Sequence, residues 1–578
     1  MRINHDIANA YANKTNAELL SKPTTSPVRK IKTPHAKYDT IPTEHLPSSL
    51  KAVYKLNEDK FQEFQGNLRE HQKDSLKAVS EALIGQINLP TGTGKTYVQK
   101  HIHIEDMIAK TKINQTGVYV IAAHRLALCT QLFDEILNLL IPCGLKADMI
   151  YVGSDRYNFD NLNQKFNSLG FAIAGMNGKQ MTSGHRIARK VRESHEKGHH
   201  TIIVSTYHSF HRLALLPKID IVTFDEAHTI PRNMFTDNIN LVKPVIERQY
   251  FFTATRKVFG EDGGMNDFEF FGEVLHEMSP RQAIELGEIV RPRIHTIRTD
   301  DADTNEINSE NVPMMVKTII EAFNEHKLKV QYPEDDKLIK RNLGTKLLVT
   351  VNGLKELHAM HDSEDFRIWC RNNNVNTFAF SSDEGEFTNF NSTGRQQTLE
   401  SMNQLQDTQD AILFHYDILT EGIDLPAITG VLLLRDLPTT KLLQNIGRGA
   451  RLLKQDRIKL YAEEIQPHET NKMIKPFCWI IIPEFLATLM GDENMKNMIK
   501  TIRETYNIQF ELMGEDDQAL ADQEHFSDRV TSHDSPNRND QLFDLNHIFE
   551  DIIVDEFVEE IALQPIPRDY LEEQLELL

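Results

Sequence analysis

Short apolar segments alternate with longer stretches of helical period along most of the chain. Between about residues 60 and 290 the apolar segments include "GVYVIAAH", "TIIVST" and "IDIVTFDEAH". A second series, "TKLLVTV", "NTFAFSS", "AILFHYD", "ITGVLLLR" and "FCWIIIP", ends near residue 485. Buried strands that alternate with helical segments are typical of a parallel sheet with crossover helices. The pattern therefore predicts two sequential α/β units.

Polar segments divide the chain further. "RTDDADTNEINSEN", near residue 300, interrupts the alternation with turn-forming and acidic residues and predicts a linker. Near the N-terminus, "KPTTSPVRKIKTPHAK" is basic and contains too little apolar surface to offset the entropy of ordering it, so a flexible arm is expected. The expected division is an N-terminal arm over 1–55, a first domain over 56–290, a linker and entry segment over 291–345, a second domain over 346–490 and a C-terminal extension over 491–578.

The negative charge of the chain is concentrated near its C-terminus. The 578 residues have a formal net charge of −20, and residues 515–578 contain 19 acidic and 3 basic residues. The other 514 residues are therefore close to neutral, with a net charge of −4. A nearly neutral body is compatible with a local basic groove, so the overall acidity does not exclude a nucleic-acid partner.

Neither a membrane span nor a secretory signal is expected from the sequence. No apolar run approaches the length of about 18 residues that a membrane span requires, and no charged-then-apolar leader is found at the N-terminus. Cys129, Cys143, Cys370 and Cys478 lack the spacing of metal ligands. We interpret them as free thiols and expect a cytoplasmic protein without a membrane partner.

The octapeptide "LPTGTGKT", which begins at Leu89, has the chemistry of a phosphate-binding loop. Gly92 and Gly94 allow the backbone to curl so that successive N–H groups face phosphate oxygens, and the next helix offers its positive N-terminus. Lys95 is predicted to pair with the β- and γ-phosphates of ATP, and Thr96 to hold Mg²⁺. Leu89 departs from the glycine that opens the G-x-x-x-x-G-K-[ST] pattern. A Gly/Thr turn that caps an ordinary helix is the alternative.

A pair of carboxylates follows a later apolar segment. The predicted strand over residues 219–224 delivers Asp225 and Glu226 to the carboxyl edge of a sheet, where open α/β sheets bind ligands. Asp225 is the candidate outer ligand of Mg²⁺, and Glu226 the candidate group that orients and deprotonates the attacking water. An Asp-Glu pair after a strand is also a common helix N-cap. The combination of this carboxylate pair with the upstream phosphate loop favours an ATP site.

These segments resemble the motifs of superfamily 2 helicases and translocases. Residues 225–228 read as a DEAH box, and "FFTAT", "ILTEGIDLP" and "QNIGRGAR" follow in the order of that family. The resemblance covers about residues 60–485 and implies two tandem RecA-like domains. Within the superfamily, the Leu-Pro-Thr start of the loop, Thr-Ala-Thr and Gly-Arg-Gly-Ala-Arg are similar to the double-stranded-DNA motors. Those motors include branch-migration, excision-repair and restriction-subunit translocases.

The resemblance assigns roles to individual residues. It implies nucleotide contacts from Arg69, Gln72, Thr91, Gly92, Thr93, Gly94, Lys95, Thr96, Gly422 and Asp424. It implies catalytic roles for Lys95, Asp225, Glu226, Gln444, Arg448 and Arg451. Nucleic-acid contacts are implied for Arg125, Thr206 and Thr420, and coupling roles for His228, Thr253 and Thr255. The Gln72 amide would bind the adenine edge. Arg448 and Arg451, three apart on a predicted helix, would reach the γ-phosphate from the second domain.

The chain differs from the RNA-directed branch of the superfamily at several motif positions. RNA-directed DEAH proteins commonly carry Arg where Asn445 stands, open the phosphate loop with Gly-Glu-Thr and carry Ser-Ala-Thr. These differences point away from that branch. Residues 151–200 hold no motif of the family. Their last part, "GHRIARKVRESHEKGHH", is interpreted as a solvated helix face, an additional contact to the DNA backbone or a histidine metal site without supporting acids or cysteines.

The leading hypothesis is an ATP-dependent DNA helicase or duplex-DNA translocase that uses Mg²⁺ and acts on duplex, forked or branched DNA. One alternative keeps the chemistry and takes RNA as the partner. Another is a nucleic-acid-sensing ATPase, a switch or clamp that does not travel. The acidic segment 545–563 has apolar residues at near-helical spacing. It is interpreted as a packed terminal helix, a mimic of nucleic-acid phosphates or a docking site for a partner protein.

Overall fold

A computed structural model describes most of the chain between residues 56 and 506. The described residues are 56–123, 132, 136–153, 178–231, 233–259, 263–297, 312–333, 340–351, 353–380, 387–415, 427–435, 437–483 and 492–506. The backbone contacts divide the chain into residues 1–47 and residues 48–578, and all described residues belong to the second unit. The expected N-terminal arm, the segment 298–311 and the acidic segment 515–578 lie outside the described residues.

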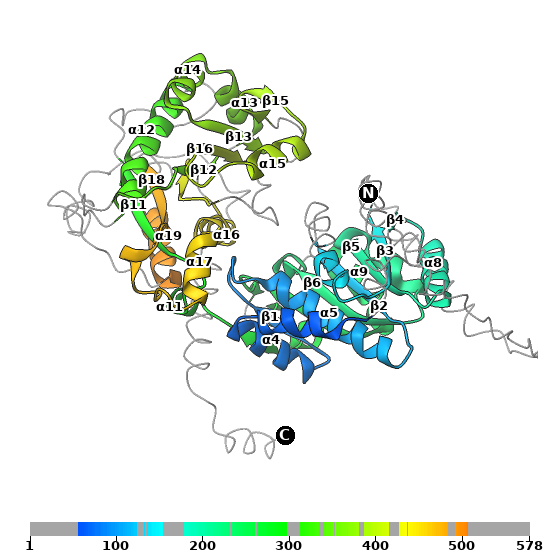
Figure 1. The fold of residues 1–578 in the computed structure, drawn as a ribbon. Coiled ribbons are helices and arrows are strands. Elements are labelled where there is room, and N and C mark those ends of the chain that lie inside the picture. The colour runs from blue at the N-terminus through cyan, green and yellow to red at the C-terminus, as the bar shows by residue number, and fades with distance from the viewer. Residues whose placement is uncertain are drawn as a thin grey trace, which may run out of the picture. The chain divides into compact units, whose positions relative to one another are not determined.

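The first sheet has eight strands, all parallel to their neighbours (Figure 1). Its order is β10-β1-β7-β6-β2-β5-β3-β4. The strands are β1 (Ile84–Asn88), β2 (Val118–Ala123), β3 (Ala147–Val152), β4 (Gly178–Gln180), β5 (His200–Thr206), β6 (Ile219–Asp225), β7 (Ile246–Thr253) and β10 (Val274–Glu277). The sequence gaps between parallel neighbours require crossover connections.

The first α/β unit also contains helices and short 3-10 turns. They are α3 (Glu58–Gly66), α4 (Glu70–Ser80), α5 (Lys95–Lys112), α8 (Gly184–Glu196), η3 (Tyr207–Leu215), η4 (Ala227–Thr229), α9 (Asn233–Asn240), η5 (Lys243–Val245), α10 (Phe268–Phe271) and α11 (Pro280–Glu285). The hairpin β8 (Val258–Phe259) and β9 (Gly263–Gly264) is antiparallel. Alternate residues of β2 enter two different hydrophobic cores: Val120 belongs to one and Ile121 to the other. The sheet is therefore covered on both faces, as its continuously apolar strands require.

The second sheet also has eight strands, in the order β11-β18-β17-β12-β16-β13-β14-β15 (Figure 1). They are β11 (Arg291–Ile297), β12 (Lys346–Thr350), β13 (Asn376–Phe380), β14 (Phe387–Thr388), β15 (Asn391–Ser392), β16 (Ala411–His415), β17 (Gly430–Leu433) and β18 (Phe477–Pro483). The pairing is parallel except for the short β14 and β15. The prediction of two α/β units built on parallel sheets is confirmed.

The helices of the second unit follow the strands in sequence. They are α12 (Val312–Gln331), α13 (Leu354–Asp362), α14 (Glu364–Asn373), α15 (Arg395–Asn403), α16 (Thr439–Gly449), α17 (Lys454–Tyr461), η6 (Thr470–Lys472) and α19 (Asp492–Tyr506). Strand β11 and helix α12 lie in the segment 291–345 that the sequence assigns to a linker and entry segment. β11 pairs with β18 over seven residues and is an edge strand of this sheet.

Two expectations concern cysteines and membranes. Cys143, Cys370 and Cys478 are free and buried, as expected, whereas Cys129 lies outside the described residues. Burial raises the pKa of the Cys143 thiol to about 11 and that of Cys370 to about 12. Among the described helices, none combines the length and apolarity that a membrane crossing requires.

Candidate nucleotide and nucleic-acid site

The predicted phosphate loop connects β1 to α5. Gly92 and Gly94 have φ angles of 95° and 87°, in the left-handed region that favours glycine. A Cβ atom at Gly94 would also lie 2.4 Å from the Gln72 side-chain nitrogen. Helix α5 begins at Lys95, and the Tyr97 N–H donates to the carbonyl oxygen of the N-cap residue Gly94 at 2.9 Å, so Lys95 and Thr96 are the residues whose N–H groups lack an acceptor one turn back and face the loop. This is the geometry of an anion-binding helix terminus.

Lys95 and the two carboxylates lie at the carboxyl edge of the first sheet. The buried Lys95 Nζ donates a hydrogen bond to the carbonyl oxygen of Leu89, at 3.1 Å. Asp225 ends β6 and is buried, and Glu226 follows with a φ of 53°, a left-handed conformation that is unusual for a residue with a Cβ atom. That conformation turns the chain sharply between the two carboxylates.

A glutamine absent from the sequence predictions contacts the first of these carboxylates. Gln99 Nε2 donates to Asp225 Oδ1 at 2.7 Å, and both side chains are buried. Burial is the main cause that raises the pKa of Asp225 to about 6. Repulsion by Glu226 also raises this pKa, whereas the charge of Lys95 and the hydrogen bond from Gln99 lower it. Gln99 stands four residues after Lys95, so both lie on the same face of α5. That spacing is the sequence signal that could have identified it.

A hydrogen-bonded series beside the second carboxylate connects Thr253, at the end of β7, with α16. His228 Nδ1 lies 3.1 Å from Thr253 Oγ1 and 3.4 Å from Glu226 Oε2, and His228 Nε2 lies 3.3 Å from Gln444 Nε2. Because an amide nitrogen can only donate, His228 Nε2 is the acceptor and Nδ1 carries the proton of the neutral ring. Thr253 Oγ1 in turn donates to the carbonyl oxygen of Thr255 at 2.7 Å. The structure therefore brings together His228, Thr253 and Thr255, which the resemblance assigns to coupling, with Gln444, which it assigns to catalysis.

The start of α4 contacts the phosphate loop. Gln72 Nε2 donates to the carbonyl oxygen of Thr93 at 2.9 Å, while Gln72 Oε1 accepts from the backbone N–H of Arg69 at 3.1 Å. His71 Nε2 lies 3.0 Å from the same Thr93 oxygen, and burial lowers the pKa of His71. The Arg69 guanidinium forms an ion pair with Glu288. His71 and Glu288 have no counterpart in the sequence predictions.

Helix α16 lies against the phosphate loop. A Cβ atom at Gly447 would be 2.7 Å from the Thr91 Cβ, and one at Gly92 would be 3.2 Å from the Arg451 Cγ. Arg448 is buried in the last turn of the helix. Arg448 therefore belongs to an element that touches the predicted nucleotide site, and Arg451 lies just after the end of that element.

The end of α16 is held by a buried lysine that the sequence analysis did not identify. Lys475 Nζ donates to the carbonyl oxygens of Gly449, at 2.5 Å, and Arg451, at 2.7 Å. Its own backbone N–H donates to Asp456 Oδ2 at 2.8 Å. Burial lowers the pKa of Lys475 to about 8. This contact satisfies carbonyl groups that a helix C-terminus leaves unpaired.

The remaining predicted residues divide into two groups. Thr96, the second residue of α5, and Thr206, the last residue of β5, are both half-buried. The residues that lie outside the described part of the chain are Arg125, Thr420, Gly422 and Asp424.

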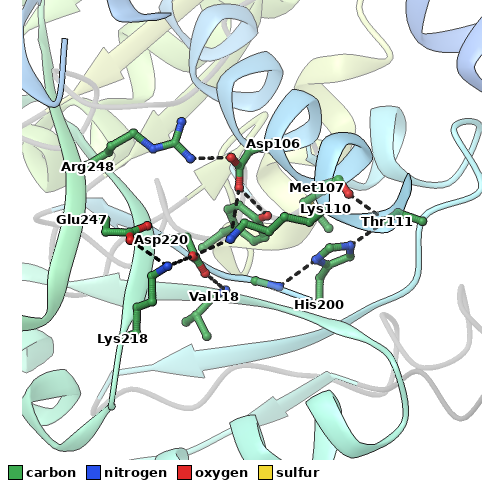
Figure 2. Close-up of polar contacts among 12 residues, drawn as sticks. Asp106, Met107, Lys110, Thr111, Val118, His200, Lys218, Asp220, Glu247 and Arg248 are labelled. Atoms are coloured by element: carbon green, nitrogen blue, oxygen red, sulfur yellow. Dashed lines mark hydrogen bonds and ion pairs between the residues drawn. The ribbon is translucent and has the colours of Figure 1, made fainter. Parts of the chain in front are cut away.

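A second polar network lies at the amino-terminal edge of the first sheet (Figure 2). Asp220, at the start of β6, accepts from Lys110 Nζ at 2.7 Å and from the Val118 backbone N–H at 2.7 Å, and pairs with Lys218 at 3.0 Å. Burial alone would raise the pKa of Asp220, but these three contacts outweigh it and lower the pKa. Asp106 pairs with Arg248 in the same network. Because these charges are mutually paired, the network ties α5 to the sheet.

Comparison with protein families gives a match over residues 65–258 to the model described as "Type III restriction enzyme, res subunit". The matched residues are about a third of the chain and contain the phosphate loop, both carboxylates and the Thr-Ala-Thr segment. The resemblance to superfamily 2 helicases is confirmed. Comparison with curated proteins gives no match.

Solved structures that match this chain include two Type ISP restriction-modification enzymes and S. cerevisiae Dbp5. The DNA-bound ATP-dependent Type ISP restriction-modification enzyme LlaBIII matches 76% of this chain and 30% of its own, with a TM-score of 0.52 and 16% identity. A nuclease-deletion mutant of the Type ISP restriction-modification enzyme LlaGI, in complex with a DNA substrate mimic, matches 76% of this chain and 29% of its own, with a TM-score of 0.47 and 17% identity. S. cerevisiae Dbp5 bound to RNA and ADP BeF3 matches 79% of this chain and 98% of its own, with a TM-score of 0.42 and 13% identity.

The likeness to LlaBIII concerns the fold alone. The chain spans less than a third of the length of either restriction enzyme.

Proposed function

We propose that this protein is an ATP-dependent motor that moves on or remodels duplex DNA, as a helicase or a duplex translocase. The series from Gln444 through His228 to Thr253 carries the proposal, because it joins helix α16 of the second α/β unit to the end of β7 in the first, and His228 Nδ1 lies 3.4 Å from the Glu226 carboxylate. A motor needs such a connection, since hydrolysis in one domain must change the position of the other. The family match favours DNA as the partner.

The residues around the loop suit ATP and Mg²⁺. The loop over 89–94 and the α5 terminus would bind the phosphates, and Arg69 and Gln72 the adenine. Asp225 has a raised pKa, and Glu226 Oε2 is buried and accepts no hydrogen bond from the described residues. Carboxylates with so few positive partners fit a divalent cation, which Asp225 and Thr96 would hold. When bound, Mg²⁺ neutralises charge on the β- and γ-phosphate oxygens.

The chain's own residues would then perform hydrolysis. Glu226 orients a water molecule and accepts its proton while the water oxygen bonds to the γ-phosphorus and the bond to the ADP oxygen breaks. Lys95 pairs with the phosphates, and Arg448 and Arg451 stabilise the charge that develops on the transferred group. An arginine supplied in this way contributes about 10³ to 10⁵ in rate. Hydrolysis therefore requires α16 to remain at the loop.

Movement would follow from the connection between nucleotide and nucleic-acid contacts. Thr253 and Thr255 in the first domain, and Gly422 and Asp424 in the second, would respond to the state of the nucleotide. Arg125, Thr206 and Thr420 would hold the phosphate backbone. Alternating grip by the two groups converts the ATP cycle into steps along a strand.

ATP hydrolysis measured with several nucleic acids tests the choice of partner. We expect the largest stimulation with duplex or forked DNA, and little with single-stranded RNA. Glu226→Gln should bind ATP but not hydrolyse it, and serves as the control for contaminating ATPases. Stimulation by RNA and not by DNA would contradict the DNA assignment while leaving the ATP site intact.

A further inference from the structure

Helix α8 presents a row of arginines. Its buried residues are Ile187, Lys190, Val191 and Ser194, whereas Arg186, Arg189 and Arg192 are exposed. The Arg189 side chain is 72% exposed, and its Nε lies 3.6 Å from Glu193 Oε1 in an exposed ion pair, which contributes little to stability and leaves the guanidinium accessible. The first acidic residue of the helix is Glu193, so its first nine residues contain no negative charge. The N-terminal half of α8 is therefore a basic surface.

Lys190, the one lysine of α8, has a structural role. Lys190 Nζ lies 2.9 Å from Asp148 Oδ2 on β3, and Ser194 Oγ donates to the same oxygen at 2.7 Å. His199 Nδ1 lies 3.3 Å from Asp148 Oδ1. Burial alone would raise the pKa of Asp148, but the hydrogen bonds from His199, Lys190 and Ser194 outweigh it and hold the pKa at about 2. The ionised Asp148 thus fixes α8 on the sheet and leaves the three arginines outside this network.

The basic half of α8 adjoins an element with a predicted nucleic-acid contact. Element η3 begins directly after Thr206. A Cβ atom at Gly184 would lie 2.8 Å from the carbonyl oxygen of Arg212, so the first residue of α8 packs on the η3 backbone. Arg212 Nη1 is buried and has no hydrogen-bond partner among the described residues. Thr206, Arg212 and the arginines of α8 therefore lie on adjoining elements.

We propose that the α8–η3 surface, formed by Arg186, Arg189 and Arg192 of α8 beside η3, binds the phosphate backbone of duplex DNA. The inference rests on the proposed function and adds a contact beyond the motifs of the family. Guanidinium groups bind phosphates in a bidentate manner, and this is the strongest form of such pairing. From Arg186 to Arg192 the helix rises about 9 Å, which matches the axial rise of two to three phosphates on one strand.

Two observations favour duplex backbone over other ligands. Tyr207 and Phe210 of η3 are buried, so neither offers the large stacking platform that single-stranded nucleic acid requires, and the exposed rings of η3 are those of His208 and His211. No group of three or more His, Cys, Asp or Glu residues could hold a metal ion within the described part of the chain. The histidine metal site considered from the sequence is therefore not favoured for His195, His199 and His200.

The test is the affinity of the full-length protein for a short blunt DNA duplex, without nucleotide, at several salt concentrations. The triple variant Arg186→Ala/Arg189→Ala/Arg192→Ala should bind at least about tenfold more weakly at low salt. Its plot of log affinity against log salt should lose about 0.9 in slope for each phosphate contact removed. The matched control, Lys60→Ala/Lys77→Ala/Lys112→Ala, removes the same charge from exposed positions of α3, α4 and α5 and should keep the wild-type slope.

A second variant tests the inference by gain of affinity. Glu193→Lys/Glu196→Lys extends the basic row along the exposed side of α8 and should tighten duplex binding. Equal affinities of the triple variant and its control would overturn the inference, as would a loss confined to single-stranded DNA. Failure of the wild-type protein to bind any nucleic acid would instead contradict the proposed function itself.

Discussion

Single residues at the carboxyl edge of the first sheet set the chemistry of the site. Asp225 is buried beside a second carboxylate, and it accepts hydrogen bonds from the neutral side-chain amide of Gln99 and from the backbone of Glu226. A hydrogen bond to a charged group contributes about 1.5 to 3 kcal/mol. The amide therefore orients the carboxylate and favours its ionised form.

Replacement of Gln99 by leucine tests this role. Gln99→Leu keeps the apolar volume and removes the donor, so we expect Mg²⁺-dependent nucleotide affinity to fall by about tenfold or more. Nucleotide affinity without Mg²⁺ should stay near wild type, because Lys95 and the loop are unchanged. Isothermal titration with and without Mg²⁺ measures both. Equal losses in the two conditions would show that Gln99 supports the fold of the loop and not the carboxylate.

The raised pKa of Asp225 predicts a pH dependence. With a pKa of about 6, the carboxyl group is neutral at lower pH and must lose its proton before it can hold a cation. Mg²⁺-dependent nucleotide affinity should therefore be constant above pH 7 and fall by up to about tenfold for each pH unit below 6. Titrations between pH 5 and pH 8 measure this. An affinity that remains constant down to pH 5 would contradict the assignment of Asp225 as a ligand.

At the scale of elements, the function depends on where α16 ends. Lys475 holds the carbonyl groups of Gly449 and Arg451, and Asp456 holds the backbone of Lys475. The two arginines expected to reach the γ-phosphate lie within this last turn and directly after it. The position of the arginines thus depends on a buried amine some 25 residues later in the chain.

Lys475→Met removes both donors at nearly constant side-chain length. We expect kcat for nucleic-acid-stimulated hydrolysis to fall by about tenfold with little change in ATP affinity, and Arg451→Ala to lower kcat by about 10²-fold or more. Steady-state kinetics and equilibrium ATP binding separate the two quantities. A fall in ATP affinity with unchanged kcat would mean that α16 contributes to binding and not to hydrolysis.

Elements with strong periodicity were predictable from the sequence, and their contacts were not. The segments "IDIVTFDEAH" and "NTFAFSS" contain β6 and β13. A short, continuous apolar run bounded by polar residues is typical of a strand that is buried on both faces of a sheet. Strand β11 lies in the segment predicted as a linker and entry to the second domain, and Arg291, Arg293 and His295 interrupt the apolar pattern of this edge strand. The Gln99–Asp225 contact joins residues 126 positions apart, which local patterns cannot reveal.

For the whole molecule, the distribution of charge matters more than its sum. The acidic segment 515–578 lies outside the described residues, and the basic α8–η3 surface lies on the first sheet's unit. If the acidic segment competes with DNA phosphates, its removal should tighten duplex binding and raise hydrolysis at limiting DNA. The difference should shrink as salt rises. Unchanged affinity at low salt in a folded truncation would eliminate competition and favour packing or partner docking.

Displacement of a third strand from a DNA triplex tests the central claim that ATP hydrolysis moves this protein along duplex DNA. With wild-type protein and ATP, the third strand should be released at a rate that depends on its distance from the loading end. Glu226→Gln should release none, because the water would not be activated. Robust DNA-stimulated hydrolysis without displacement or strand separation would contradict the motor and favour a stationary ATPase clamp.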